Sequence, residues 1–349
     1  MIPEQTNTEY KRWLWNVLNS IDRDNCAGLI RAVFDRQVAW HGPHPINDLH
    51  GCDQLAEDHY APLYSAFPDL DRHDDLFLAG SWKGDHWIAA AGHYRGTFAS
   101  DWLGIPSTGT RASLRFGEFY KIDANRIVEC FVLFDLPDLY AQAGIGLLPP
   151  SLGDVVAVPG PASGDGVLIG TRPDGEAARS MRLVEDMIGD LMRYDPARPD
   201  DYEVMRHDRC WHEDMCWYGP SGIGTTRGIA EFIDRQQKPF LKAFPDRKAG
   251  HAHASRIADG HYAASTGWPG VVATHSGDGW LGQAASNREI GMRVMDFWCR
   301  DGDKLRENWV LIDIVELFLQ FGVDLLAQAG NTTTNKIPVS EKYGDSHPN

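Results

Sequence analysis

Two short segments of the chain place carboxylates and apolar or aromatic residues at alternate positions. One is Glu307-Asn308-Trp309-Val310-Leu311-Ile312-Asp313, and the other is Glu129-Cys130-Phe131-Val132-Leu133-Phe134-Asp135. As β-strands, both put Glu, an aromatic ring, Leu and Asp on one face. Burial on such a face raises the pKa of a carboxyl group towards the neutral range, where general acid/base catalysis works. The segments therefore predict proton transfer, with Asp135 and Asp313 as the acid/base groups.

Other side chains are expected around these aspartates as substrate-binding groups. Those on the same strand faces are Glu129, Phe131, Glu307 and Trp309, and those expected across the sheet are Glu118, Tyr120, Asp296 and Trp298. A Trp-x-Gly-Pro motif that occurs twice adds Trp40, His41, Trp217 and Tyr218. An alternative for the two aspartates is that each only caps the helix expected after it, over 136–143 or 314–321, because Asp is a favoured N-cap residue.

The chain repeats itself. Trp40-His41-Gly42-Pro43 recurs 177 positions later as Trp217-Tyr218-Gly219-Pro220, and Ala66-Phe67-Pro68-Asp69 recurs at the same offset as Ala243-Phe244-Pro245-Asp246. Asp135 and Asp313 are 178 positions apart. Several matches in one order at a nearly constant offset indicate a tandem duplication.

Each copy shows helical patterns first and strand patterns later, which is typical of an α+β unit. Helices are expected over 10–18, 22–34, 51–67, 179–194, 202–210 and 227–244, and strands over 38–40, 75–78, 87–90, 113–122, 128–135, 215–218, 261–266, 290–299 and 305–313. The expected domains are residues 1–146 and 178–330. A Gly/Pro-rich segment over 147–177 is a linker or an ordered strap, and 331–349 is a flexible tail.

The paired motifs, together with Leu103-Gly104-Ile105-Pro106-Ser107-Thr108-Gly109, resemble the SnoaL-like polyketide cyclase family of the NTF2-like superfamily. The resemblance implies two α+β cone-shaped barrels, each a curved antiparallel sheet wrapped over N-terminal helices around a mostly apolar pocket. It also implies sheet-to-sheet pairing of the copies as an intramolecular pseudo-dimer, with a homodimer as a further possibility.

In these cyclases a final-strand Asp works without a cofactor, assisted by a His on a neighbouring strand. By that resemblance the His position is His93 in the first copy. In the second copy Trp268 stands there and His275 follows shortly after. The copies therefore differ at the site, and one of the two pockets is expected to have diverged.

Net charge, cysteine spacing and the motifs that are not found disfavour several classes of partner and site. The formal charge of −16 disfavours nucleic acid and anionic membranes as partners. The six cysteines have no CxxC spacing, so neither a disulfide framework nor a metal site is expected. No signal peptide, membrane span, P-loop or GxGxxG motif is visible, and the cytoplasm is the expected location.

The combined prediction is a cofactor-independent acid/base enzyme acting on a small, partly apolar carbonyl compound. Aldol cyclisation, isomerisation, and hydration or dehydration are the candidate reactions. The alternative is a non-catalytic module that binds a small molecule or supports an assembly, since this superfamily carries many functions on one frame.

Overall fold

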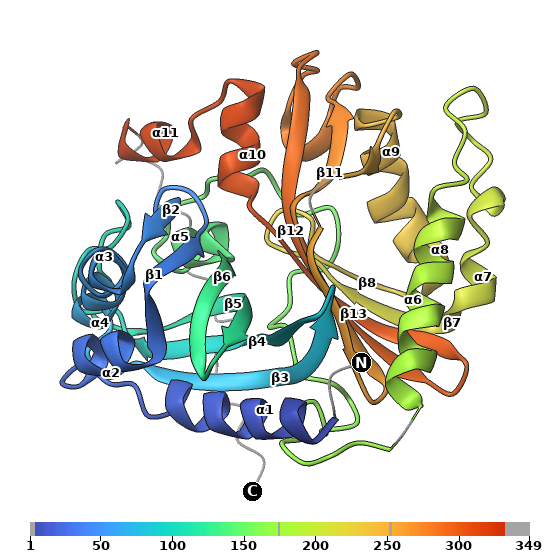
Figure 1. Ribbon diagram of the computed structural model, residues 1–349. Helices are drawn as coiled ribbons and strands as arrows, with labels where there is room; N and C mark the ends of the chain where they lie inside the picture. Colours follow the sequence, from blue (N-terminus) through green and yellow to red (C-terminus); the bar gives the residue numbers. More distant parts are fainter. Residues whose placement is uncertain (1–3, 174, 251–252, 332–349) are drawn as a thin grey trace, which may run out of the picture.

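The computed structural model describes residues 4–173, 175–250 and 253–331, and it shows two halves that face each other through their sheets (Figure 1). Each sheet lies within one copy of the sequence repeat. The expected tail, 331–349, lies outside the described residues except for Asn331.

The first half is a six-stranded sheet with helices against one face. Its strand order is β2-β1-β6-β5-β4-β3, antiparallel except for the parallel pair β1–β6. The strands are β1 (Phe34–His41), β2 (Asp48–His50), β3 (Asp71–Trp82), β4 (Asp85–Thr97), β5 (Arg111–Asp123) and β6 (Arg126–Phe134). The helices are α1 (Glu4–Leu18), α2 (Cys26–Val33), α3 (Cys52–Leu55), η1 (Ala56–Tyr60), α4 (Ala61–Ala66) and α5 (Leu136–Gln142).

The second half repeats this plan with the strand order β10-β11-β12-β13-β7-β8, and β9 pairs with β11. Its strands are β7 (Trp211–Tyr218), β8 (Thr225–Arg227), β9 (Lys248–Ala249), β10 (His253–Asp259), β11 (Tyr262–Thr274), β12 (Glu289–Asp301) and β13 (Lys304–Ile312). Its helices are α6 (Glu176–Leu191), η2 (Glu203–Met205), α7 (His207–Cys210), α8 (Gly228–Phe232), η3 (Ile233–Gln237), α9 (Lys238–Ala243), η4 (Trp280–Gly282), α10 (Ile314–Phe321) and α11 (Leu325–Asn331). The predicted α+β architecture, with a sheet and helices in each of the two copies, is confirmed.

Two long helical segments, 52–66 (α3, η1 and α4) and 228–243 (α8, η3 and α9), begin and end for the same local reasons. Gly51 precedes the first segment and Gly228 is the first residue of the second, with φ of +83° and +76°, a conformation that favours glycine. A proline follows shortly after each helix ends, at Pro68 and Pro245. Each helix also contains one π-helical turn, η1 or η3, which is a feature often found at functional sites.

The expected helix over 202–210 is wrong. The structure has the 3-10 turn η2 and the short helix α7 there. Arg206 separates them because its φ of +46° lies in the left-handed region and interrupts helical geometry.

The faces of the two sheets that lie away from the helices pack against each other. This contact contains apolar side chains from both copies, among them Leu76, Phe119, Phe131, Phe297 and Trp309. The two halves thus form an intramolecular pseudo-dimer, and the sheet face that a homodimer would use is already occupied.

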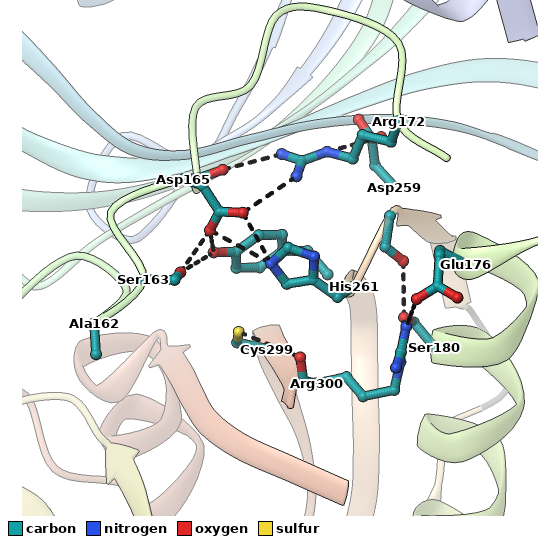
Figure 2. Close-up of polar contacts among 12 residues, drawn as sticks. Ala162, Ser163, Asp165, Arg172, Glu176, Ser180, Asp259, His261, Cys299 and Arg300 are labelled. Carbon is teal, nitrogen blue, oxygen red and sulfur yellow. Dashed lines mark hydrogen bonds and ion pairs between the residues drawn. The ribbon is translucent and has the colours of Figure 1, made fainter. Parts of the chain in front are cut away.

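Within the described part of the Gly/Pro-rich segment, residues 147–173 contact both halves and are called the strap below. Its Pro159 carbonyl accepts a hydrogen bond from Trp309 Nε1 at 2.8 Å. Asp165 accepts a hydrogen bond from Ser163 of the strap and lies 3.1 Å from His261 in the β10–β11 turn (Figure 2). Arg172 of the strap contacts Asp259 at the end of β10.

Candidate functional site

The second half encloses a mostly apolar cavity of about 210 Å³ between its helices and the concave face of its sheet. Aromatic and aliphatic side chains from α6, α8 and the sheet form most of the wall, including Met187, Trp217, Phe232, Trp298 and Val310. The polar side chains in the wall are Gln236, Gln237, Arg247, Lys248, Arg256, Ser265, Asp296 and Asn308. A mostly apolar wall with a few polar groups is typical of a small-molecule site.

Strand register explains why these polar groups converge. β12 and β13 pair so that Asp296 lies opposite Val310 and Trp298 opposite Asn308. Because side chains alternate across a sheet, these four point into the cone. The π-helical turn η3 ends at Gln237, which is buried and joins them from the helical side.

Asp296 is the carboxyl group of this cavity. Burial raises its pKa to about 7, although Asn308 Nδ2, 3.3 Å from its Oδ1, and the charge of Arg256 act in the opposite direction. A carboxyl group with this pKa can both accept and return a proton near neutral pH.

Arg256 supplies positive charge near this carboxyl group. Burial lowers the pKa of its guanidinium, and Glu185 and Asp296 partly oppose that effect. Its buried Nε has no hydrogen-bond partner among the described residues, and the same holds for Trp298 Nε1 and Gln237 Oε1. A bound ligand with a carbonyl oxygen would accept from the two donors, and a ligand hydroxyl would donate to Gln237 Oε1.

The corresponding position in the first half is filled by its own side chains. Glu118, 178 positions before Asp296, accepts hydrogen bonds from Tyr94 Oη at 2.7 Å and Tyr120 Oη at 2.6 Å. Arg72 Nη2 lies 2.7 Å from Glu118 Oε2, and its guanidinium stacks over Phe116. This network satisfies the buried carboxylate internally, so the two copies have diverged.

Asp313 does not face the cone, contrary to the expectation that it borders the pocket. Its Oδ2 accepts hydrogen bonds from the His44 amide of the first half at 2.9 Å and from Arg293 Nη1 at 3.1 Å. Its Oδ1 accepts one from the Glu316 amide at 3.2 Å, so Asp313 caps α10. Burial raises its pKa to about 6.

Asp135 occupies the equivalent place on the other side of the contact. Its Oδ2 accepts a hydrogen bond from the Ser221 amide at 2.9 Å, and it makes no side-chain cap hydrogen bond to α5. Arg115 beside it donates to the carbonyls of Gly219 and Tyr218. Both predicted aspartates therefore tie one half to the Gly-Pro turn of the other.

The reason for this difference lies in the choice of strand face. The predicted alternation of Glu307, Trp309, Leu311 and Asp313 is present, but this face packs against the first half. Glu307 accepts from the Ala162 amide of the strap. The same applies to Phe131 and Glu129 in β6, which lie on the equivalent face: His41 stacks on the Phe131 ring at 4.5 Å and approaches the Glu129 carboxylate at 3.6 Å.

The remaining predicted residues lie at several separate places. Trp40 packs on His59 in the first core, and Tyr218 stacks on Trp309 between the sheets. His275 is fully buried between Phe244 and Phe321, away from the cavity lining. His93 pairs with Asp75 at 3.0 Å, and Trp268 lies against Arg293.

Of the predicted residues, Trp217, Asp296 and Trp298 are brought together in the cavity. Asn308 and Arg256 were missed. The available signal was a polar residue at an inward position of an apolar strand, since Asn308 alternates with Val310 and Ile312.

Two structural tests bear on cofactors and membranes. Within 4–173, 175–250 and 253–331, no group of three or more His, Cys, Asp or Glu side chains is placed to hold a metal ion. In the same part of the chain, no helix combines the length and apolar character needed to cross a membrane.

Comparison with known proteins gives a family and a set of structural neighbours. The family model described as SnoaL-like polyketide cyclase matches residues 10–143 and 194–321. AclR from Streptomyces galilaeus is 18% identical, with 40% of this chain and 97% of that chain covered and a TM-score of 0.34. IdmH from Streptomyces antibioticus is 20% identical (35% and 90% covered, TM-score 0.29), and an NTF2-like protein from Burkholderia xenovorans is 16% identical (42% and 97% covered, TM-score 0.32). No curated protein matched the chain.

Proposed function

Because the chain belongs to the SnoaL-like polyketide cyclase family, we propose that its second copy is a cyclase-type acid/base enzyme and that its first copy is a catalytically silent partner. The observation that carries this proposal is the Asp296 carboxyl group, with a pKa of about 7, in an apolar cavity. The first copy has Glu118 at that position, already bonded to Tyr94 and Tyr120.

The proposed chemistry uses only groups of this chain. Asp296 would remove a proton α to a carbonyl group, and the Arg256 guanidinium and the Asn308 amide would stabilise the enolate oxygen. The proton returned by Asp296 would complete an aldol ring closure, an isomerisation or a dehydration without a cofactor. We assign the acid/base role to Asp296 and not to Asp135 or Asp313, because those two carboxylates bond to backbone amides between the halves.

The cavity also limits the substrate. Its volume of about 210 Å³ is below the roughly 300–1,000 Å³ typical of drug-sized ligands. Trp217, Trp298 and Phe232 offer ring faces to the ligand. The proposed substrate is therefore a compact carbonyl compound with one or two rings.

Exchange of α-protons tests this proposal without knowledge of the natural substrate. The full-length protein is incubated in D₂O with 2-tetralone, 1-indanone or acetophenone, and loss of the α-proton signals is followed by NMR. We expect catalysed exchange with at least one ketone, and we expect Asp296→Asn to slow it about 100-fold or more.

Asp313→Asn is the matched control. It should keep the exchange rate, because Asp313 lies outside the cavity. Equal loss in folded Asp313→Asn, or full activity in Asp296→Asn, would contradict the assignment. Failure of all three ketones to exchange, together with no ligand-induced rise in melting temperature, would favour the non-catalytic module.

A further inference from the structure

A second cavity, of about 250 Å³, lies between the two halves and is distinct from the cavity of the second copy. Its wall comes from three parts of the chain: strands and α5 of the first half, the strap, and the Gly-Pro turn of the second half. The lining includes His93, Arg115, Asp135, Asp138, Ser151 and Val156.

The wall contains polar atoms that the protein leaves without partners. Asp135 is only 6% exposed, and its Oδ1 makes no hydrogen bond of normal geometry within the described residues. Burial raises the pKa of this carboxyl group, although the Arg115 charge and the Ser221 and Asp138 amides act in the opposite direction. Ser151 Oγ is likewise buried and unpaired among the described residues. Buried polar atoms beside a cavity are normally satisfied by a bound molecule or by water.

The charges that face this cavity are mainly negative. Three carboxylates line it, those of Asp135, Asp138 and Asp154, and Arg235 neutralises Asp154 at 2.9 Å. Arg115 is the lining guanidinium; its donors go to backbone carbonyls, and its positive charge partly offsets the negative charges of the Asp135 and Asp138 carboxylates.

The Asp135 carboxylate also opposes ionisation of Asp138. Burial and then the neighbouring Asp135 raise the pKa of Asp138 to about 7. His93, the remaining titratable group in the lining, is bonded to Asp75. A cation placed between Asp135 and Asp138 would relieve this repulsion.

The strap forms part of the wall of this cavity, on one side of the pseudo-dimer. Leu152, Gly153 and Asp154 donate backbone hydrogen bonds to the turn and strand at residues 222–225. This contact holds Val155 and Val156 over the cavity, where they are 59% and 41% exposed. At the equivalent place in the second copy, Asp313 Oδ1 is satisfied by the Glu316 amide.

We propose that this interdomain cavity is a binding site for a small organic ammonium ion that carries an apolar group. The ammonium would donate hydrogen bonds to Asp135 Oδ1 and the Asp138 carboxylate, and the apolar group would cover Val155 and Val156. The site is independent of the proposed reaction at Asp296.

Isothermal titration calorimetry of the full-length protein at pH 8 with phenethylammonium tests the proposal. We expect one saturable site per chain. 2-Phenylethanol and 3-phenylpropionate, which have similar shapes but lack the positive charge, should bind at least about tenfold more weakly. Asp138→Asn and Asp135→Asn should each weaken the ammonium by about tenfold or more.

Two control variants complete the design. Glu316→Gln, at the position equivalent to Asp138, and Asp296→Asn, in the other cavity, should leave the affinity unchanged. Asp138→Asn keeps an acceptor for Gln142 and is the decisive variant if Asp135→Asn fails to fold. Absence of saturable binding would show a cavity that holds only water and would overturn the proposal. Equal affinity for the alcohol, or loss in Asp296→Asn but not in Asp138→Asn, would also overturn it.

Discussion

The proposed role of Asp296 as a base conflicts with its effect on stability. It borders the cavity, and the surrounding protein removes enough water to raise its pKa from 3.8 to about 7. Protonated, it is a neutral group in a mostly apolar wall, whereas ionised it is a charge that Asn308 and Arg256 stabilise only in part. The form needed to remove a proton is therefore the form that the fold tolerates less well.

We predict that Asp296 makes a contribution to stability that falls as pH rises from about 4 to about 7, and that Asp296→Asn removes this contribution. Between the unfolded and folded pKa values, the folded state binds more protons than the unfolded state, so raising the pH favours unfolding. Urea denaturation at several pH values measures this. An unchanged slope in Asp296→Asn would contradict the raised pKa.

The activity of Asp296 as a base should change with pH in the opposite direction. The rate of α-proton exchange should rise with pH and level off above about 7, because only the ionised carboxylate accepts a proton. A rate that falls over this range would show that another group is the base.

The sequence predicted some residues of this cavity but grouped them wrongly. Asp296, Trp298 and Trp217 were expected to bind substrate, and they line it. The sequence analysis grouped Asp296 and Trp298 with Glu307 and Trp309 in one site. Strand alternation separates the two faces of a sheet but does not show which face lies against the helices. The repeated Glu and Asp suggested chemistry, whereas the structure shows them at the contact between the copies.

Among the elements, the strap and the two halves meet at a buried ion cluster. Asp259 in β10 accepts a hydrogen bond from Lys11 of α1 at 2.5 Å, and Arg172 of the strap lies 3.1 Å from it. The Lys11 and Arg172 side chains are each 2% exposed. Charges buried to this extent require their partners.

Asp259→Asn should lower the free energy of unfolding by about 3 kcal/mol, because it removes the carboxylate that the buried Lys11 and Arg172 side chains share. Urea denaturation measures the change. Asp303→Asn, which removes an exposed ion pair with Arg179, is the control and should have little effect. Equal stability of the two variants would contradict the proposed importance of the cluster.

This cluster was not predictable from the repeat. Lys11, Arg172 and Asp259 lie in α1, the strap and a strand that the sequence analysis did not predict. Long helices and strands follow from periodicity, but contacts between distant segments depend on how the halves dock. The composition of the strap indicated turns and left open whether it was ordered.

At the scale of the whole molecule, the contact between the sheets is only nearly symmetric. Phe119 and Phe297 are equivalent residues, and their rings lie 5.5 Å apart. Gly117 and Met295 are also equivalent, but a Cβ at Gly117 would lie 3.0 Å from Met295 Sδ. The second copy therefore supplies the Met295 side chain, and Gly117 of the first copy leaves room for it.

Gly117→Met should destabilise the protein by about 1–3 kcal/mol through overpacking, and the double variant Gly117→Met/Met295→Gly should regain part of that loss. Thermal unfolding of the three proteins checks this. A Gly117→Met variant as stable as the parent would show that the contact has spare volume.

The Gly117–Met295 pair has a consequence for the history of the chain. Two separate, identical subunits would present Met to Met or Gly to Gly at this point, so neither sequence could arrive at the present fit by itself. Fusion keeps each copy beside the other at an effective concentration in the millimolar range. The two contact surfaces could then change independently of each other. The same holds for the two pockets, of which the first is closed by Arg72 and the second is open around Asp296.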